Sequence, residues 1–223
     1  DHLIIHPFDS TFSQLSAQDF VRTILVEKLN VGKIIIGHDH RFGKGRTAGI
    51  HDLIDFGETY NFDVEQIGPQ EVNDVSVSST KIRKALEIGD IATANAYLGY
   101  AYILSGTIVE GAKLGRTLGF PTANLKIETD KLIPRDGVYI VRASVKGEMR
   151  FGMMNIGNRP TVDGQSRSIE INFLDTDANL YGEEITANVL HRLRDEQKFA
   201  SLDDLKSQLT NDLLATRAFI GGR

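Results

Sequence analysis

The most informative part of the sequence is residues 106–125, GTIVEGAKLGRTLGFPTANL. Glycine recurs here at positions 106, 111, 115 and 119, within or after a β-branched run that predicts a strand. Glycine tolerates positive φ and close backbone approach, so consecutive N–H groups of such a loop can hold phosphate oxygens. Lys113 and Arg116 add positive charge to the same loop. From the residues alone, a phosphate-binding loop and a glycine-rich hairpin with one polar face are equally well supported.

Two polar residues follow the glycines at alternating positions. Thr122 and Asn124 are two apart on a predicted strand, so both side chains lie on one face of it. A hydroxyl and an amide oxygen are suitable ligands for Mg²⁺, which keeps most of its water molecules and takes few protein oxygens. The pair therefore predicts a divalent-cation site beside the loop.

From residue 102 onward the chain is rich in short β-branched segments. Strands are predicted at 102–109, 137–145, 149–155, 168–174 and 185–193, separated by Gly, Pro, Asp and Asn clusters. Such a series is typical of an antiparallel sheet or a small barrel. The chain closes with a helix that Ser201 caps, and one face of this helix is formed by Leu202, Leu205, Leu209, Leu213 and Leu214.

Upstream, predicted helices and strands alternate. A β-branched run from Lys33 to Gly37 predicts a buried strand, and a second strand at 62–67 follows a helix at 50–60. This alternation implies crossover connections and a parallel sheet. Two short helices at 79–87 and 91–98 lead to a change of pattern near residue 98. We therefore predict an α/β domain at residues 1–98 and a small antiparallel β-barrel domain with a C-terminal helix at residues 99–223.

Composition excludes several classes of function. The net charge is −5, and residues 99–223 contribute nothing to it because they hold 16 basic and 16 acidic side chains. A broad basic surface for nucleic acid is therefore not expected. No apolar run approaches the about 20 residues that span a bilayer, so no membrane partner is expected. The chain has no cysteine, which excludes disulfides and thiol nucleophiles and fits a cytoplasmic location. The sequence does not indicate an oligomeric state.

Four motifs, in order, resemble those of the riboflavin kinase family. They are GRTLGFPTANL at 115–125, MNIGNRPT at 154–161, SIEINFLD at 168–175 and LRDEQKF at 193–199. The resemblance covers residues 100–219, and four motifs in order are far more specific than any one alone. It implies a flavokinase that phosphorylates riboflavin to FMN, with ATP as co-substrate and Mg²⁺ or another divalent cation as cofactor.

The resemblance also implies roles for individual residues. Glu170 is expected to be the catalytic base, and Thr122 and Asn124 the metal ligands. The ATP phosphates are expected at Gly111, Lys113, Gly115, Arg116, Gly119 and Pro121. A loop that folds over the flavin is expected to comprise Asn155, Gly157, Arg159, Pro160 and Thr161.

Without the resemblance, the same strands have plainer interpretations. Glu170 is then a surface carboxylate that shares a face with Ser168 and Asn172. Arg192 and Arg194 alternate on the last strand and are expected to face solvent. Tyr139 and Phe173 could line a flavin pocket, but an aromatic on a barrel strand is more often part of the core.

The first domain resembles the adenylyltransferase half of the bifunctional bacterial flavin synthetases, which implies a partial Rossmann-like nucleotidyltransferase fold. The resemblance rests on GHDHRFGKGR at 37–46 and SSTKIR at 78–83. From the residues alone, the second motif is either a polyphosphate site at a helix start or an ordinary serine-capped helix, the latter being favoured. The implied nucleotide site comprises His38, Asp39, Arg41, Phe42, Ser78, Ser79, Thr80 and Arg83.

One departure from that family affects what we expect of the first domain. The phosphate-binding motif Gly-x-Phe-Asp-Gly-x-His-x-Gly-His has no counterpart in residues 1–98. We therefore expect the N-terminal part of the adenylyltransferase domain to be missing and its site to be incomplete. A reading of His38 and His40 as metal ligands is disfavoured, because no third ligand stands at a recognisable zinc spacing.

Three functions remain open at this point. The first is a flavokinase that converts riboflavin and ATP to FMN and ADP. The second is an FMN adenylyltransferase that makes FAD in the full-length protein. The third is a non-catalytic flavin- or nucleotide-binding barrel. In each case the expected partners are small molecules.

Overall fold

The computed structural model describes residues 2–69, 71–72, 75–111, 114–127, 130–161, 164–176 and 178–222, with only the backbone described at 75, 114, 159–161 and 164–166. Its contacts divide the chain into two compact units, Asp1–Ser76 and Val77–Arg223. Each unit is described by itself.

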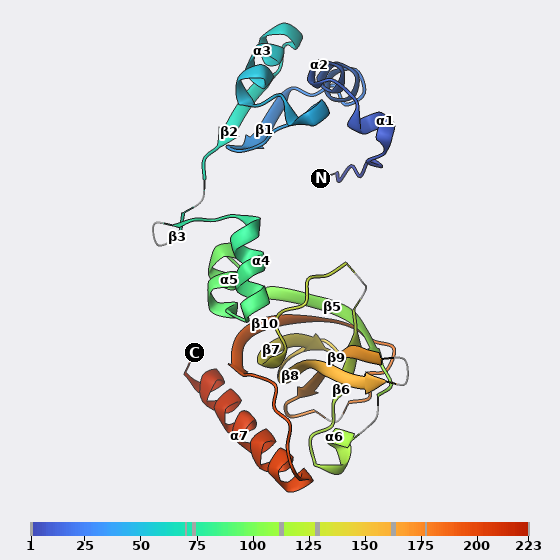
Figure 1. Ribbon diagram of the computed structural model, residues 1–223, viewed down its shortest axis with the longest axis vertical. Helices are drawn as coiled ribbons and strands as arrows, with labels where there is room; N and C mark the ends of the chain where they lie inside the picture. Colours follow the sequence, from blue (N-terminus) through green and yellow to red (C-terminus); the bar gives the residue numbers. More distant parts are fainter. Residues whose placement is uncertain are drawn as a thin grey trace. The chain divides into compact units, whose positions relative to one another are not determined.

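The first unit has the predicted alternation of helices and strands (Figure 1). Strands β1 (Lys33–Gly37) and β2 (Asp63–Ile67) pair in parallel, as predicted, through a crossover that contains α3 (Ile50–Tyr60). Its core is built around Val21, Leu53 and Phe62. The remaining elements are α1 (Ser10–Ser13), α2 (Ala17–Asp19), a π-helix (Phe20–Val26), a 3-10 turn (Lys44–Arg46), β3 (Glu71–Val72) and β4 (Val75–Ser76).

The prediction that Lys33–Gly37 is a buried strand is wrong. Side chains along β1 alternate between exposed and partly buried, and Ile35 is 56% exposed. Ile34 and Ile36 point to the other face and pack on the small core. Because successive strand residues point to opposite faces, only one face of this run is covered in the described part of the unit.

The second unit is a closed antiparallel barrel with the strand order β10-β5-β6-β9-β8-β7. Its alternating strands fill the interior with one hydrophobic core, in which Tyr139, Met154 and Ile171 are fully buried. The elements are α4 (Ser79–Ile88), α5 (Ile91–Leu98), β5 (Tyr102–Val109), α6 (Leu114–Thr117), β6 (Ala123–Lys126), β7 (Gly137–Val145), β8 (Glu148–Thr161), β9 (Gly164–Phe173), β10 (Glu184–Arg194) and α7 (Leu202–Gly221). The predicted barrel and C-terminal helix are confirmed (Figure 1).

Helices α4 and α5 pack on the barrel, and the contacts divide the chain between residues 76 and 77. Leu86, Ile91 and Ala94 of these helices belong to the same buried cluster as the barrel interior. The Asn95 side chain fixes the end of α5, because its amide donates to the Val189 carbonyl at 2.9 Å and its oxygen accepts from the backbone of β5 at 2.8 Å. The sequence pattern therefore changes near residue 98, whereas the contacts divide the chain earlier, after Ser76.

Arg192 lies against Gly89 of the α4–α5 turn and does not face solvent as predicted. Its Nε donates to the Tyr139 hydroxyl at 3.3 Å, and its Nη2 donates to the Asp136 carbonyl at 2.9 Å and the Asp195 carboxylate at 2.6 Å. A Cβ on Gly89, at the end of α4, would lie 2.6 Å from Arg192 Nε. The hydrogen bond from Arg192 lowers the pKa of Asp195. Burial raises the pKa of Tyr139, which is a core residue.

Candidate functional site

Glu170 lies at the centre of a three-strand section of the barrel wall. In the antiparallel registers, Asn124 of β6 pairs with Glu170 of β9, and Asn155 of β8 pairs with Glu170 from the other side. Paired residues point to the same face, so these three side chains share one face. The neighbours Ile169 and Ile171 point into the barrel core. The two amides and the carboxylate therefore lie on the outer face of the wall.

Thr122 and Glu170 form the polar contact that connects the entry of β6 to this wall. The Thr122 hydroxyl donates to Glu170 Oε2 at 3.0 Å. Both side chains are partly buried. The interaction brings together two of the predicted site residues that are 48 positions apart in the chain.

The donor set around Glu170 fits a small divalent cation. Thr122, Asn124 and Glu170 offer hydroxyl, amide and carboxylate oxygens, which are the ligand types that Mg²⁺ prefers. Asn124 also lies against the glycine-rich segment, because a Cβ on Gly111 would fall 2.2 Å from Asn124 Nδ2. Glycine at 111 is therefore required for this close approach.

A cavity of about 330 Å³ lies between this outer wall and the C-terminal helix. We call it the α7 cavity. Its polar residues include Thr122, Asn155, Glu170 and Asn172, and an apolar side is formed by Leu118, Phe120, Val138, Met153, Phe199, Leu205 and Leu209. Arg194, Glu196 and Asp212 complete the polar lining. An apolar surface with a few convergent polar groups is the usual character of a small-molecule site.

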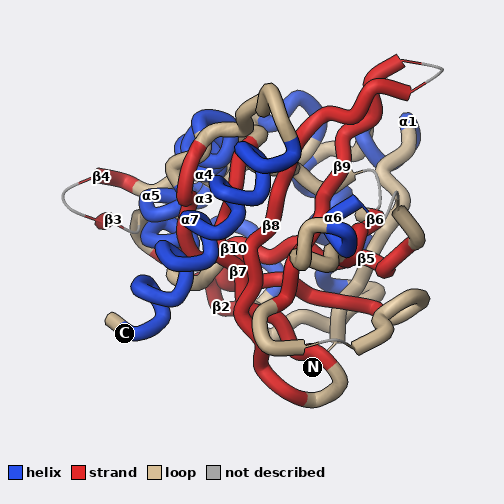
Figure 2. The backbone as a smooth tube through the Cα atoms, turned by 90° about the horizontal axis from the view of Figure 1, so that it is seen from below, coloured by secondary structure: helices blue, strands red, loops and turns tan. Residues whose placement is uncertain are grey.

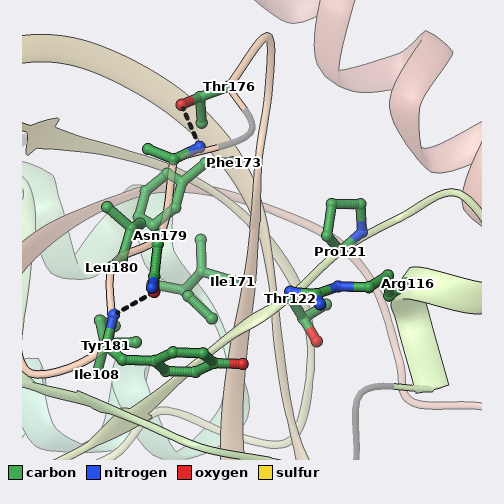
Figure 3. A pocket seen from close by; sticks show the side chains of 12 residues that line it. Ile108, Arg116, Pro121, Thr122, Ile171, Phe173, Thr176, Asn179, Leu180 and Tyr181 are labelled. Atoms are coloured by element: carbon green, nitrogen blue, oxygen red, sulfur yellow. Dashed lines mark hydrogen bonds between the residues drawn. The ribbon is translucent and has the colours of Figure 1, made fainter.

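A second cavity of about 270 Å³, which we call the Tyr181 cavity, adjoins the same threonine. Figure 3 shows Arg116, Pro121 and Thr122 on one side of it and the group around Phe173, Leu180 and Tyr181 on the other. Thr122 lines both cavities. Glu170, which accepts from Thr122, lines only the α7 cavity, so Thr122 is the member of the pair that lies between the two cavities.

The glycine-rich segment contains a one-turn helix, α6, which includes Gly115 and Arg116. The Phe120 N–H closes the segment on the Gly115 carbonyl at 2.8 Å, and Gly119 has a φ of 84°. Gly115 lines the α7 cavity, whereas Arg116 lines the Tyr181 cavity. Lys113 lies outside the described residues.

The prediction that residues 155–161 form a loop is wrong. Residues 155–161 continue β8 and pair with β9 from Asn155↔Glu170 to Thr161↔Gly164, so the two strands run side by side (Figure 2). The Gly and Pro of the motif sit within this long hairpin. Gly157 is buried, and a Cβ there would lie 2.0 Å from Glu196 Oε1. The side chains of Arg159, Pro160 and Thr161 lie outside the described part of the structure.

The residues of the α7 cavity that were not predicted as site residues include two buried polar side chains. Asp212 of α7 is 4% exposed and accepts from Arg194 Nε at 2.9 Å and from Arg194 Nη2 at 2.7 Å. Asn172 of β9 is also buried. Arg194 therefore does not face solvent. Helical periodicity could not identify Asp212, because the partner that makes its burial favourable comes from β10.

The residues predicted for the adenylyltransferase nucleotide site fall in both compact units. His38, Asp39 and Arg41 follow β1 and are exposed, whereas Phe42 packs on the core of the first unit. Ser78 caps α4 in the second unit, where its Oγ accepts from the Lys81 N–H at 3.3 Å. Ser79, Thr80 and Arg83 lie on the first two turns of α4 and are exposed.

Two further features are absent from the described residues. These residues contain no cluster of three or more His, Cys, Asp or Glu side chains placed to hold a metal ion. Among the helices of the described ranges, none combines the length and apolar character needed to cross a membrane.

Comparisons with known proteins match both parts of the chain. The riboflavin kinase family model matches residues 98–220, and the FAD synthetase family model matches residues 1–81. A bifunctional riboflavin kinase/FMN adenylyltransferase from Escherichia coli strain K12 is 40% identical over 99% of this chain and 71% of its own length. The protein of the same name from Listeria monocytogenes is 40% identical over 98% of this chain and 69% of its own length.

A solved structure shares the fold of most of the chain. It is described as a macrolide-efflux protein from Streptococcus pneumoniae, and it superposes with a TM-score of 0.84 at 33% sequence identity. The match covers 94% of this chain and 67% of that one. The efflux activity in that description is a statement about that protein, and the property it shares with this chain is the fold.

Proposed function

Because the chain belongs to the family of bifunctional riboflavin kinases/FMN adenylyltransferases, we propose that residues 99–223 transfer the γ-phosphoryl group of ATP to the 5′-hydroxyl of riboflavin. The products are FMN and ADP. The observation that carries this proposal is Thr122, which lines both cavities and donates to Glu170 in the wall of one of them. A kinase needs such a junction, because its two substrates bind separately and react where they touch.

The α7 cavity is the proposed riboflavin site and the Tyr181 cavity the proposed ATP site. The leucines, Met153 and the phenylalanines of the α7 cavity offer an apolar surface for the flavin ring. In the Tyr181 cavity, Ile171, Phe173 and Leu180 offer an apolar surface for the base, and Arg116 lies on the side that carries Thr122. Gly111, Lys113, Gly115, Gly119 and Pro121 complete the proposed phosphate-binding segment.

Glu170 is the proposed catalytic base. Its carboxylate accepts a hydrogen bond from the 5′-hydroxyl and takes the proton as that oxygen bonds to the γ-phosphorus and the bond to the ADP oxygen breaks. In phosphoryl transfer the protein contributes mainly alignment and charge neutralisation, so a carboxylate of ordinary basicity suffices to orient the hydroxyl. Thr122 and Asn124 would hold Mg²⁺, which supplies positive charge to the phosphate oxygens when bound.

The same proposal includes a role for the β8–β9 hairpin and a location. Of the hairpin residues, Asn155 of β8 lies in the wall of the proposed flavin site. The reaction takes place in the cytoplasm, in keeping with a cysteine-free chain.

A second activity, FMN adenylylation to FAD, is proposed for the protein through residues 1–98. The match of residues 1–81 to the FAD synthetase family is the observation that favours it. His38, Asp39, Arg41 and Phe42 are the proposed nucleotide-site residues that follow β1, and Ser78, Ser79, Thr80 and Arg83 those that begin α4.

Incubation of the chain with riboflavin, ATP and Mg²⁺, followed by chromatography of the flavins, tests both activities. FMN is the expected product of the kinase, and FAD in the same chromatogram reports the adenylyltransferase. A reaction without Mg²⁺ and one with EDTA are the controls for the cation. If riboflavin binds but neither FMN nor FAD forms, the non-catalytic flavin-binding barrel replaces the kinase proposal.

A further inference from the structure

Asn172 of β9 forms a hydrogen bond with the chain just before β6 begins. The β6–β9 ladder consists of Ala123↔Ile171 and Asn124↔Glu170, so Pro121 and Thr122 precede it. Asn172 is 9% exposed, and its Nδ2 donates to the Pro121 carbonyl at 2.7 Å. A side chain of β9 thus extends the connection to β6 beyond the backbone ladder.

The Asn172–Pro121 hydrogen bond lies beside the Thr122–Glu170 hydrogen bond. Glu170 and Asn172 are two apart on β9 and therefore point to the same face. Glu170 accepts from the Thr122 side chain, and Asn172 donates to the backbone of the preceding residue, Pro121. Two neighbouring residues are therefore fixed by two side chains of one strand.

Both fixed residues line the Tyr181 cavity, and Thr122 also lines the α7 cavity. Pro121 and Thr122 line the Tyr181 cavity, while Asn172 lines the α7 cavity. We infer that Asn172 is a positioning residue that sets the place of Thr122 through the Pro121 carbonyl. This inference rests on the proposed kinase function. Its consequence is that loss of the amide weakens binding of the Mg²⁺–nucleotide, although the amide itself lies in the other cavity.

Two variants of Asn172 and one control test this role. Asn172→Asp keeps the shape but replaces the donor by an oxygen that repels the Pro121 carbonyl, and Asn172→Ala removes the donor without adding bulk. The control is Asn188→Asp on β10, since the Asn188 amide also donates to a strand carbonyl, that of Arg142 at 3.2 Å, and lines neither cavity. Thermal unfolding of each variant checks that it is folded.

Binding of ADP with Mg²⁺ is measured by calorimetry, and binding of riboflavin by quenching of flavin fluorescence. Loss of the hydrogen bond to the Pro121 carbonyl removes the restraint on Thr122, so we expect both Asn172 variants to bind Mg²⁺–ADP about 10-fold more weakly. Riboflavin binding should change less than about 3-fold, and the KM for ATP should rise more than the KM for riboflavin. The Asn188 variant should match the wild type in every binding measurement.

Two results would overturn the inference. A loss confined to riboflavin would make Asn172 a direct flavin contact, and unchanged binding of both ligands would make it a purely structural residue. The wild-type chain is assayed for FMN formation first. If it makes FMN, failure of the Asn172 prediction leaves the kinase proposal intact, and if it makes none, the kinase proposal fails on its own.

Discussion

At the scale of the residue, the proposed chemistry depends on what surrounds the Glu170 carboxylate. Strand alternation places Glu170 opposite to Ile169 and Ile171, which are buried in the core. That alternation alone fits a surface carboxylate equally well. Two features distinguish Glu170 from a surface carboxylate. It accepts a hydrogen bond from Thr122, and it lies in the wall of the α7 cavity. A carboxylate so placed can orient a substrate hydroxyl and accept its proton.

We predict that Glu170→Gln lowers kcat about 100-fold, the usual scale for loss of a general base. The amide keeps the volume and can still accept from Thr122, so riboflavin binding should remain near the wild-type value. Steady-state kinetics and fluorescence quenching measure the two quantities. Glu184→Gln is a matched control, because Glu184 also accepts from a threonine hydroxyl of a neighbouring strand, that of Thr107 at 3.1 Å. Wild-type turnover in Glu170→Gln would remove Glu170 from the mechanism.

Residues that belong to a contiguous motif can be predicted from the sequence. Residues whose importance lies in a contact with a distant part of the chain cannot. Thr122, Asn124 and Glu170 were predicted from motifs, and the structure brings them to adjacent strands. Their assigned roles stay predictions. Asn172 was noted only as a neighbour on the same face, because its significance lies in a hydrogen bond to Pro121, 51 positions away.

At the scale of the element, α7 shows how a helix can be predicted while its buried face is not. The helix begins after Ser201, as predicted, and Ser201 Oγ accepts from the Asp204 N–H at 3.1 Å. Leu202 and Leu214, predicted on the packed face, are 56% and 61% exposed. Asp212 and Thr216 are buried in their place. A count of apolar residues cannot foresee this, because the burial of Asp212 depends on the guanidinium of Arg194.

Removal of one partner of the Arg194–Asp212 pair should therefore lower the free energy of unfolding strongly, whereas replacement of both partners by apolar residues should change it little. We predict that Asp212→Ala lowers the free energy of unfolding by about 3–5 kcal/mol, because it leaves Arg194 buried without its counter-charge. The double variant Arg194→Met with Asp212→Leu should unfold within about 1 kcal/mol of the wild type, because well-packed apolar residues replace a buried pair at little cost. Urea unfolding followed by circular dichroism measures both. Equal stability of the single and the double variant would contradict this account.

At the scale of the whole molecule, the sequence pattern and the contacts divide the chain differently. The change from alternating helices and strands to strands alone lies near residue 98, and the riboflavin kinase match begins there. The contacts divide at residue 76, because Leu86, Ile91 and Ala94 share the core of the barrel. The SSTKIR motif at the start of α4, which resembles the adenylyltransferase family, is therefore part of the compact unit that contains the barrel, which a pattern read along the chain could not reveal.

This division predicts which fragment of the chain is stable. A fragment of residues 77–223 should unfold in one cooperative step, whereas a fragment of residues 99–223 should lose at least several kcal/mol of unfolding free energy. Burial of one large aliphatic side chain contributes about 1.5–3 kcal/mol, and the shorter fragment loses Leu86 and Ile91, each 1% exposed, together with both hydrogen bonds of Asn95. Urea unfolding of the two fragments at one temperature measures the difference. Leu86→Ala in the longer fragment is the internal check, expected to cost about 2–5 kcal/mol on its own. Equal stability of the two fragments would place the true boundary at residue 98 and reduce α4 and α5 to an appendage of the barrel.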